Sequence, residues 1–186
     1  KVLQTSDGGY LVLANKVLPG KSLDMWLIKT DASGNVQWDV AYGFPDADNL
    51  IGIDAAPDGG YVVAGYNAQS IRVSKINSIG QVHWLKKFDV GLGDATFGIR
   101  VAPNSECLLV LPAFAPGMSF GSTLMKLTAQ GDSLWAKHYL ETAPGYSGPF
   151  LYGLAFAPNN RYVLCGGVST PNGDLWPVIT LADTDG

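Results

Sequence analysis

The stretch Pro57-Asp58-Gly59-Gly60-Tyr61-Val62-Val63-Ala64-Gly65, followed by Lys75-Ile76-Asn77-Ser78-Ile79-Gly80-Gln81-Val82-His83-Trp84, decides the fold. Its Asp-Gly-Gly segment predicts a tight hairpin turn, because glycine readily adopts the positive φ that such turns need. The apolar run that follows predicts a strand, and the segment around Gly80 predicts a second turn. The stretch is therefore interpreted as turn, strand, strand, turn and strand.

Copies of this unit recur along the whole chain of 186 residues. The second turn recurs with its glycine at intervals of 46, 51 and 55 residues, at Gly34, Gly80, Gly131 and Gly186. A tryptophan follows three of these glycines, and the first two intervals recur between Trp38, Trp84 and Trp135. The first turn recurs at residues 6–10, 57–61, 103–107 and 158–162, although the third copy has no glycine and is expected to be looser. A period near 50 residues predicts a propeller or a related array.

Each unit holds up to four predicted strands. In the second unit we expect them near residues 51–56, 61–67, 71–77 and 82–89. The second strand of each unit is an apolar run without alternation, which favours burial on both faces. The third strand alternates polar and apolar residues, and the fourth has most of the charges.

These patterns predict an all-β fold, a β-propeller of four repeats with four-stranded antiparallel blades, the last of them incomplete. We expect the blades near residues 1–43, 49–91, 95–141 and 151–186. We also expect a fragment of a larger ring, which the rest of the propeller or a second copy would close.

Composition argues against several classes of partner. Charged residues make up 15% of the chain, the net charge is −4 and the isoelectric point is near 4.9. A protein that binds nucleic acid through phosphates normally has a basic stripe, and only Lys86-Lys87 stand together here. We therefore expect no nucleic acid, and no membrane insertion because no apolar run approaches about 20 residues.

The quoted segments resemble a known kind of repeat. Residues 58–65 (DGGYVVAG) and 26–38 (WLIKTDASGNVQW) are similar to the propeller repeats of secreted bacterial and archaeal surface proteins, common in exported proteins of the Bacteroidota. The resemblance covers nearly the whole chain and implies an extracellular or cell-surface location. Residues 31–38 are also similar to the tryptophan-docking motif of quinoprotein propellers, which implies that Trp38, Trp84 and Trp135 pack between blades. Because no adjacent cysteine pair exists, the resemblance implies no cofactor.

Several motifs suggest chemistry and are weighed against simpler interpretations. Residues 117–121 form a G-x-S-x-G, but Pro116 precedes it and no helix follows, which favours a loop. His83 and His138 lack metal-ligand spacing, so we expect exposed histidines and no metal site. Residues 45–49 suggest either a solvated turn or a calcium loop through Asp46 and Asp48.

Two cysteines, Cys107 and Cys165, lie far apart in the sequence. We expect two buried thiols, with a disulfide as the alternative.

The loops that differ most between copies are expected on one face of the ring, where binding usually occurs. The aromatic, methionine and acidic residues predicted to form this face are Phe44, Asp46, Asp48, Met118, Phe120, Tyr146, Phe150 and Trp176. We expect a non-catalytic protein-interaction or scaffold module and no enzyme activity. The alternative is a lectin-like propeller that stacks Tyr146 or Trp176 on a glycan.

Overall fold

The chain is described here by a computed structural model, which covers residues 1–17, 23–42, 49–66, 70–89, 98–113, 121–140, 150–159, 161–170 and 172–185. All regular elements in these ranges are strands, and no helix among them is long and apolar enough to span a membrane. The strands are β1 (Val2–Gln4), β2 (Tyr10–Val17), β3 (Leu23–Thr30), β4 (Val36–Tyr42), β5 (Asn49–Ala55), β6 (Tyr61–Tyr66), β7 (Ser70–Ile76), β8 (Val82–Asp89), β9 (Gly98–Val101), β10 (Cys107–Ala113), β11 (Gly121–Leu127), β12 (Ser133–Leu140), β13 (Phe150–Ala157), β14 (Arg161–Ser169) and β15 (Leu175–Ala182).

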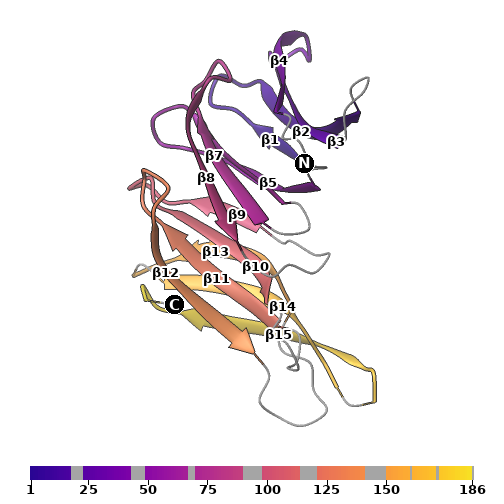
Figure 1. Cartoon of the computed structure of the whole chain (residues 1–186), viewed down its shortest axis with the longest axis vertical. Helices are drawn as coiled ribbons and strands as arrows, with labels where there is room; N and C mark the ends of the chain where they lie inside the picture. The colour runs from indigo at the N-terminus through magenta and orange to yellow at the C-terminus, as the bar shows by residue number, and fades with distance from the viewer. Residues whose placement is uncertain are drawn as a thin grey trace.

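The strands form four antiparallel sheets, which we call blades 1 to 4. Blade 1 has the order β1-β2-β3-β4, blade 2 β5-β6-β7-β8, blade 3 β9-β10-β11-β12, and blade 4 β13-β14-β15. Each blade is an antiparallel meander, because every strand pairs with the strand that precedes it in the same sheet. Blades 1 and 4 lie at opposite ends of the array (Figure 1). The all-β prediction is confirmed, and the strands of the second unit lie within two residues of their predicted bounds.

The first turn adopts one geometry in the first three units, regardless of its glycines. In blades 1 and 2, Gly8 and Gly59 have a φ of 82° and close the turn through backbone hydrogen bonds. In blade 3, Ser105 occupies the same place with a φ of 66°, and its N–H donates to the carbonyl of Ala102 at 2.8 Å. The expectation of a looser third turn is therefore wrong: the flanking strands hold a serine in a backbone conformation that disfavours side chains.

Apolar side chains pack between successive blades. We call the side of a blade that faces the following blade its leading face, and the opposite side its trailing face. The leading face of blade 1 contributes Leu11, Leu13 and Leu27 to one core cluster, and the trailing face of blade 2 contributes Tyr61 and Val63. Two further clusters join blades 2 and 3 and blades 3 and 4 in the same way. The described core thus consists of three layers between four sheets.

Burial of the inner strands depends on the place of the blade in the array. The apolar strand β6 is buried along nearly all its length, as predicted, but its counterparts β2 and β14 alternate between buried and exposed. The third strand of blade 2 alternates polar and apolar residues in sequence, yet every residue of β7 is buried between blades 1 and 3. Both described cysteines are free thiols, but Cys165 is exposed and only Cys107 is buried, which corrects half of the expectation for them.

Candidate functional site

A lysine paired with a turn carboxylate recurs in the first three blades, buried in blades 1 and 2 and partly buried in blade 3. The ammonium Nζ atoms of Lys29, Lys75 and Lys126 lie 2.8 Å from carboxylate oxygens of Asp7, Asp58 and Glu106, respectively. Each lysine stands near the end of its third strand and points from the leading face, and each acid belongs to the first turn of the same blade. In blade 4 the same strand position holds Leu181, which pairs across the sheet with Val163.

Hydrogen bonds from the lysines keep the three carboxylates charged by lowering their pKa. The lysine ammonium is the main cause of the lowered pKa of Asp7, Asp58 and Glu106. Burial alone would lower the pKa of Lys126, but hydrogen bonds to Glu106 and Tyr162 outweigh it and raise the pKa. The three carboxylates and Lys126 are therefore not close to exchanging a proton at neutral pH, which general acid–base catalysis would require.

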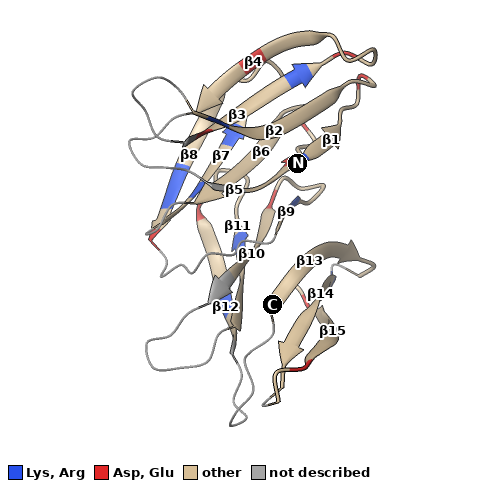
Figure 2. Cartoon of the chain, turned by 90° about the vertical axis from the view of Figure 1, so that its right-hand side faces the viewer, with Lys and Arg blue, Asp and Glu red and all other residues tan. Residues whose placement is uncertain are grey.

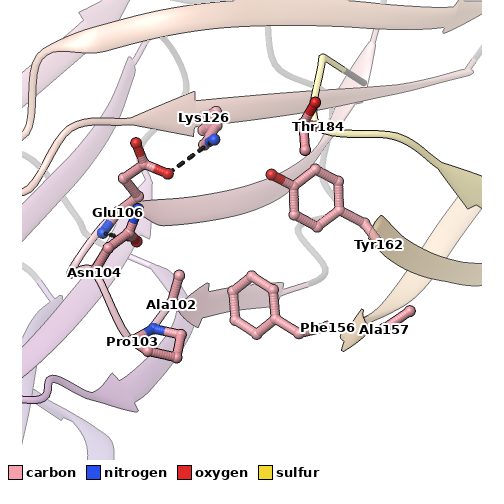
Figure 3. Close-up of a pocket in the computed structure, with 9 residues that line it drawn as sticks. All are labelled: Ala102, Pro103, Asn104, Glu106, Lys126, Phe156, Ala157, Tyr162 and Thr184. Carbon is pink, nitrogen blue, oxygen red and sulfur yellow. Dashed lines mark hydrogen bonds and ion pairs between the residues drawn. The ribbon is translucent and has the colours of Figure 1, made fainter. Parts of the chain in front are cut away.

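The pair in blade 3 borders a pocket of about 500 Å³ between blades 3 and 4 (Figure 3). Glu106, Lys126 and Asn104 form its polar wall, and the rings of Phe156 and Tyr162 lie opposite, 6.0 Å apart between centroids. The remaining lining residues are Ala102, Pro103, Ala157 and Thr184. The same lysine–carboxylate pair occurs in blades 1 and 2. The charged residues of the pocket are therefore a repeated feature of the scaffold, and they do not by themselves indicate a ligand-binding site.

A second cavity, of about 370 Å³, lies among the innermost strands β1, β5, β9 and β13. Asp54 and Arg100 contribute opposite charges to its lining, and Tyr152 adds an aromatic ring. The Asp54 carboxylate accepts a hydrogen bond of 2.8 Å from the backbone N–H of Val101. This carboxylate therefore links blade 2 to the first strand of blade 3.

Asp24 in β3 is buried, and neither of its carboxylate oxygens has a hydrogen-bond partner among the described residues. An unpaired buried carboxylate is costly. Calcium takes six to eight oxygen ligands, and no group of three or more potential metal ligands occurs among the described residues. One carboxylate is too little to define a metal site.

The four tryptophans that the sequence analysis names as site or inter-blade residues all lie in the described part of the chain. The indole N–H of Trp38 donates to the carbonyl of Ser78 at 3.1 Å, and that of Trp84 donates to Ala129 at 3.0 Å, so each reaches the next blade. The Trp135 ring lies 6.5 Å from that of Tyr162 in blade 4. Trp176, at the outer end of β15, is 60% exposed.

The structure brings together few of the other predicted site residues. Phe44, Asp46, Asp48, Met118, Phe120 and Tyr146 lie outside the described residues, as does the serine of the G-x-S-x-G motif. Phe150 begins β13 and is half-buried. His83 and His138 are exposed on different blades, and His138 Nδ1 lies 2.8 Å from the Thr123 hydroxyl.

The leading face of blade 4 is an apolar surface that sequence reasoning missed. Ile179 and Leu181 are 78% and 56% exposed, and Leu175 and Cys165 are also exposed beside them. Cross-strand pairing places Cys165 opposite Ile179 and Val163 opposite Leu181, so these side chains share one side of the sheet. Strands β13 and β15 contain no charged residue, as the tan ribbons of Figure 2 show. The sequence feature that could have predicted this apolar surface is Leu181, which replaces the lysine found at the same position in blades 1 to 3.

Comparisons with known proteins bear on the fold. No protein-family model and no curated protein matches this sequence. Among solved structures, the chain resembles one described as "Crystal structure of puromycin hydrolase", with a TM-score of 0.50 and 15% sequence identity. The match covers 96% of this chain and 26% of that chain, so this chain spans about a quarter of that protein's length. At this identity the likeness shows the fold, a β-propeller arrangement of blades, and not an activity.

This comparison corrects the expectation that the chain has no enzymatic role. That solved protein, whose fold is similar, is described as a hydrolase. Because functions are attached to folds through particular sites, a propeller arrangement with sparse charge does not indicate absence of catalysis. The specific resemblance to exported Bacteroidota proteins stays a prediction.

Proposed function

We propose that this chain is a scaffold and protein-interaction segment of a secreted or cell-surface β-propeller protein. The propeller fold supports an interaction or scaffold role in general. The observation that carries the specific proposal is the leading face of blade 4, where Cys165, Leu175, Ile179 and Leu181 expose contiguous apolar side chains. Contiguous apolar surface of this kind marks contact sites for other proteins.

The charge distribution supports the same surface. In blades 1 to 3 the leading face includes a lysine that needs a carboxylate from the adjoining turn, whereas in blade 4 the lysine position holds Leu181. The charged residue that shares this face, Arg161, lies at the end of it beside the turn. A partner can therefore cover Cys165, Ile179 and Leu181 without desolvating an ion among them, which is the costly step in burying charged surface.

Site-specific photo-cross-linking tests the proposal. A photoreactive side chain placed at Ile179 is expected to give an adduct of discrete mass, and mass spectrometry then identifies the cross-linked protein. The same probe at Ile79, in a turn of blade 2 and similarly exposed, is the control. Equal diffuse labelling from both positions would contradict a specific interaction surface on blade 4.

A second candidate, glycan binding, is favoured by the exposed indole of Trp176. An exposed tryptophan offers a flat apolar ring with a polar N–H, which suits stacking on a sugar. Binding on a glycan array that is lost in Trp176→Ala but kept in Ile179→Ala would favour this candidate. Equal binding by both variants would remove it.

A further inference from the structure

The polar wall of the pocket between blades 3 and 4 comes from a turn that departs from the repeat. Backbone hydrogen bonds align Glu106 with Gly60 of blade 2, and Asn104 then takes the place of Asp58. A β-carbon at Gly60 would overlap the carbonyl oxygen of Ile76, so blade 2 has no room for a side chain there. Blade 3 does have room, and its acid stands at this place instead. The ion pair is therefore kept, while the turn adds a longer carboxylate and an amide to the pocket.

The opposite wall of the pocket departs from the repeat as well. Phe156 pairs across the sheet with Tyr162, whereas the equivalent residues in the first strands of blades 2 and 3 are Ala55 and Val101. Tyr162 is buried, but Phe156 is 38% exposed, and its ring lines the pocket opposite the ion pair (Figure 3). Blade 4 thus adds an aromatic ring where blades 2 and 3 have a small or aliphatic side chain.

The ion pair has hydrogen-bonding capacity that its described contacts do not exhaust. An ammonium group has three N–H donors, and a carboxylate has about four acceptor positions. Among the described residues, Lys126 lies 2.8 Å from Glu106 and hydrogen-bonds to Tyr162, and Asn104 hydrogen-bonds to Glu106. The side chains of Lys126 and Glu106 are 13% and 28% exposed, and both line the pocket.

This arrangement favours a neutral ligand that has hydroxyl groups. The two charges of the pair compensate one another, so a charged ligand would have to displace one of the partners. A hydroxyl group can donate to the carboxylate and accept from the ammonium while the pair stays intact. The exposed ring of Phe156 suits the apolar C–H face of a sugar ring, whose hydroxyl groups lie around its edge.

We propose that the pocket between blades 3 and 4 binds a neutral saccharide, which stacks on Phe156 and hydrogen-bonds to Glu106, Lys126 and Asn104. Its volume of about 500 Å³ is typical of small-molecule sites and holds a mono- or disaccharide. The site lies between two described blades, away from the leading face of blade 4. The inference therefore goes beyond the proposed interaction surface, and it shares only the class of ligand with the glycan candidate at Trp176.

Saturation-transfer difference NMR tests the site, with the methyl glycosides of glucose, galactose, mannose and N-acetylglucosamine and the disaccharides lactose and cellobiose as probes. At least one probe is expected to give a signal with the unmodified chain, and titration then gives its dissociation constant. Phe156→Ala and Glu106→Gln are each expected to weaken binding of that probe by about 10-fold or more, because each removes a direct contact.

Two matched variants control for indirect effects. Tyr152→Ala removes an exposed aromatic ring of the same strand, β13, that does not line this pocket. Asp58→Asn changes the equivalent ion pair of blade 2. Both variants are expected to bind the probe as the unmodified chain does, and far-UV circular dichroism checks that every variant keeps the fold.

The possible failures are distinguishable. No signal from any probe would overturn the inference, and photo-cross-linking from Ile179 would still test the interaction surface by itself. Binding lost in Trp176→Ala but kept in Phe156→Ala would also overturn the inference, and would favour the glycan candidate at Trp176 instead. Equal weakening by Glu106→Gln and Asp58→Asn would overturn it as well, because the effect would then come from the repeated ion pair rather than from this pocket.

Discussion

Strands β6 and β14 are copies of one another, yet their surroundings differ. Both are apolar second strands that follow a turn, and both have a tyrosine near their start, Tyr61 and Tyr162, that is buried against the preceding blade. β6 is covered on its two faces by blades 1 and 3, whereas β14 is covered only on the side of blade 3. The difference teaches that the repeat specifies which face of a blade is apolar, and the neighbouring blade decides whether that face is buried.

The largest effect is expected from the third-strand leading-face position in blades 3 and 4. Leu124→Ala is expected to lower the free energy of unfolding by about 2–4 kcal/mol, because it removes a fully buried side chain and leaves a cavity. Ile179→Ala changes the equivalent residue of blade 4 and is expected to cost less than about 0.5 kcal/mol. Urea unfolding at a concentration where the chain is monomeric measures both. Equal losses would contradict the comparison.

A smaller effect is expected for the tryptophans. Trp84→Phe removes the hydrogen bond to Ala129 in the next blade and part of a packed ring, and is expected to cost about 1–2 kcal/mol. Trp176→Phe alters an exposed indole and is expected to leave the urea midpoint nearly unchanged. A large shift for Trp176→Phe together with none for Trp84→Phe would refute the inter-blade role that we propose for Trp84.

The ion pairs are expected to contribute less again. Asp58→Asn leaves the buried Lys75 ammonium beside a neutral amide and is expected to cost about 1 kcal/mol, a value limited because the Asp58 side chain is half exposed. Asp89→Asn breaks the exposed pair with Lys87 and is the control, with a change close to zero. Chemical denaturation at neutral pH compares the two. Equal changes in the free energy of unfolding for the two variants would mean that burial of Lys75 does not strengthen its ion pair.

Acid is expected to destabilise the chain through the same carboxylates. The pKa values of Asp7, Asp58 and Glu106 are lowered in the folded state, chiefly by hydrogen bonds from lysine. Their stabilising contribution is therefore present above the unfolded pKa of about 4 and is lost as the pH falls through the lower folded values. The urea midpoint should decrease below about pH 4, and less steeply in a variant that combines Asp7→Asn, Asp58→Asn and Glu106→Gln. Parallel pH profiles would show that other groups cause the decrease.

The sequence predicted the repeat, the strands and the composition of the blades because each is a local property. Glycine turns and apolar runs repeat with a period that any copy reveals, so the bounds of β8 were predicted without error and those of β7 within one residue. The exposure of Cys165 and the full burial of β7 could not be predicted in this way, because they depend on how many blades cover a given sheet.

The candidate site was harder to predict than the fold. The predicted binding residues were in the variable loops, and most of them lie outside the described ranges. The informative change was instead inside the repeat: Leu181 replaces the lysine of blades 1 to 3, and Asn159 replaces the acid of the turn in blades 1 and 2. A pairwise comparison of the copies would have shown this coordinated loss of charge, but only the structure shows that the altered face is exposed.

Labelling of Cys165 with an iodoacetamide dye tests the central claim most directly, since this thiol lies on the leading face of blade 4. Cys107 does not interfere, because burial raises its pKa to about 11 and keeps it from the dye. We predict rapid labelling of one thiol in the folded chain and of two thiols after unfolding in urea. Slow labelling of both thiols in the folded chain would contradict the claim that the leading face of blade 4 is exposed.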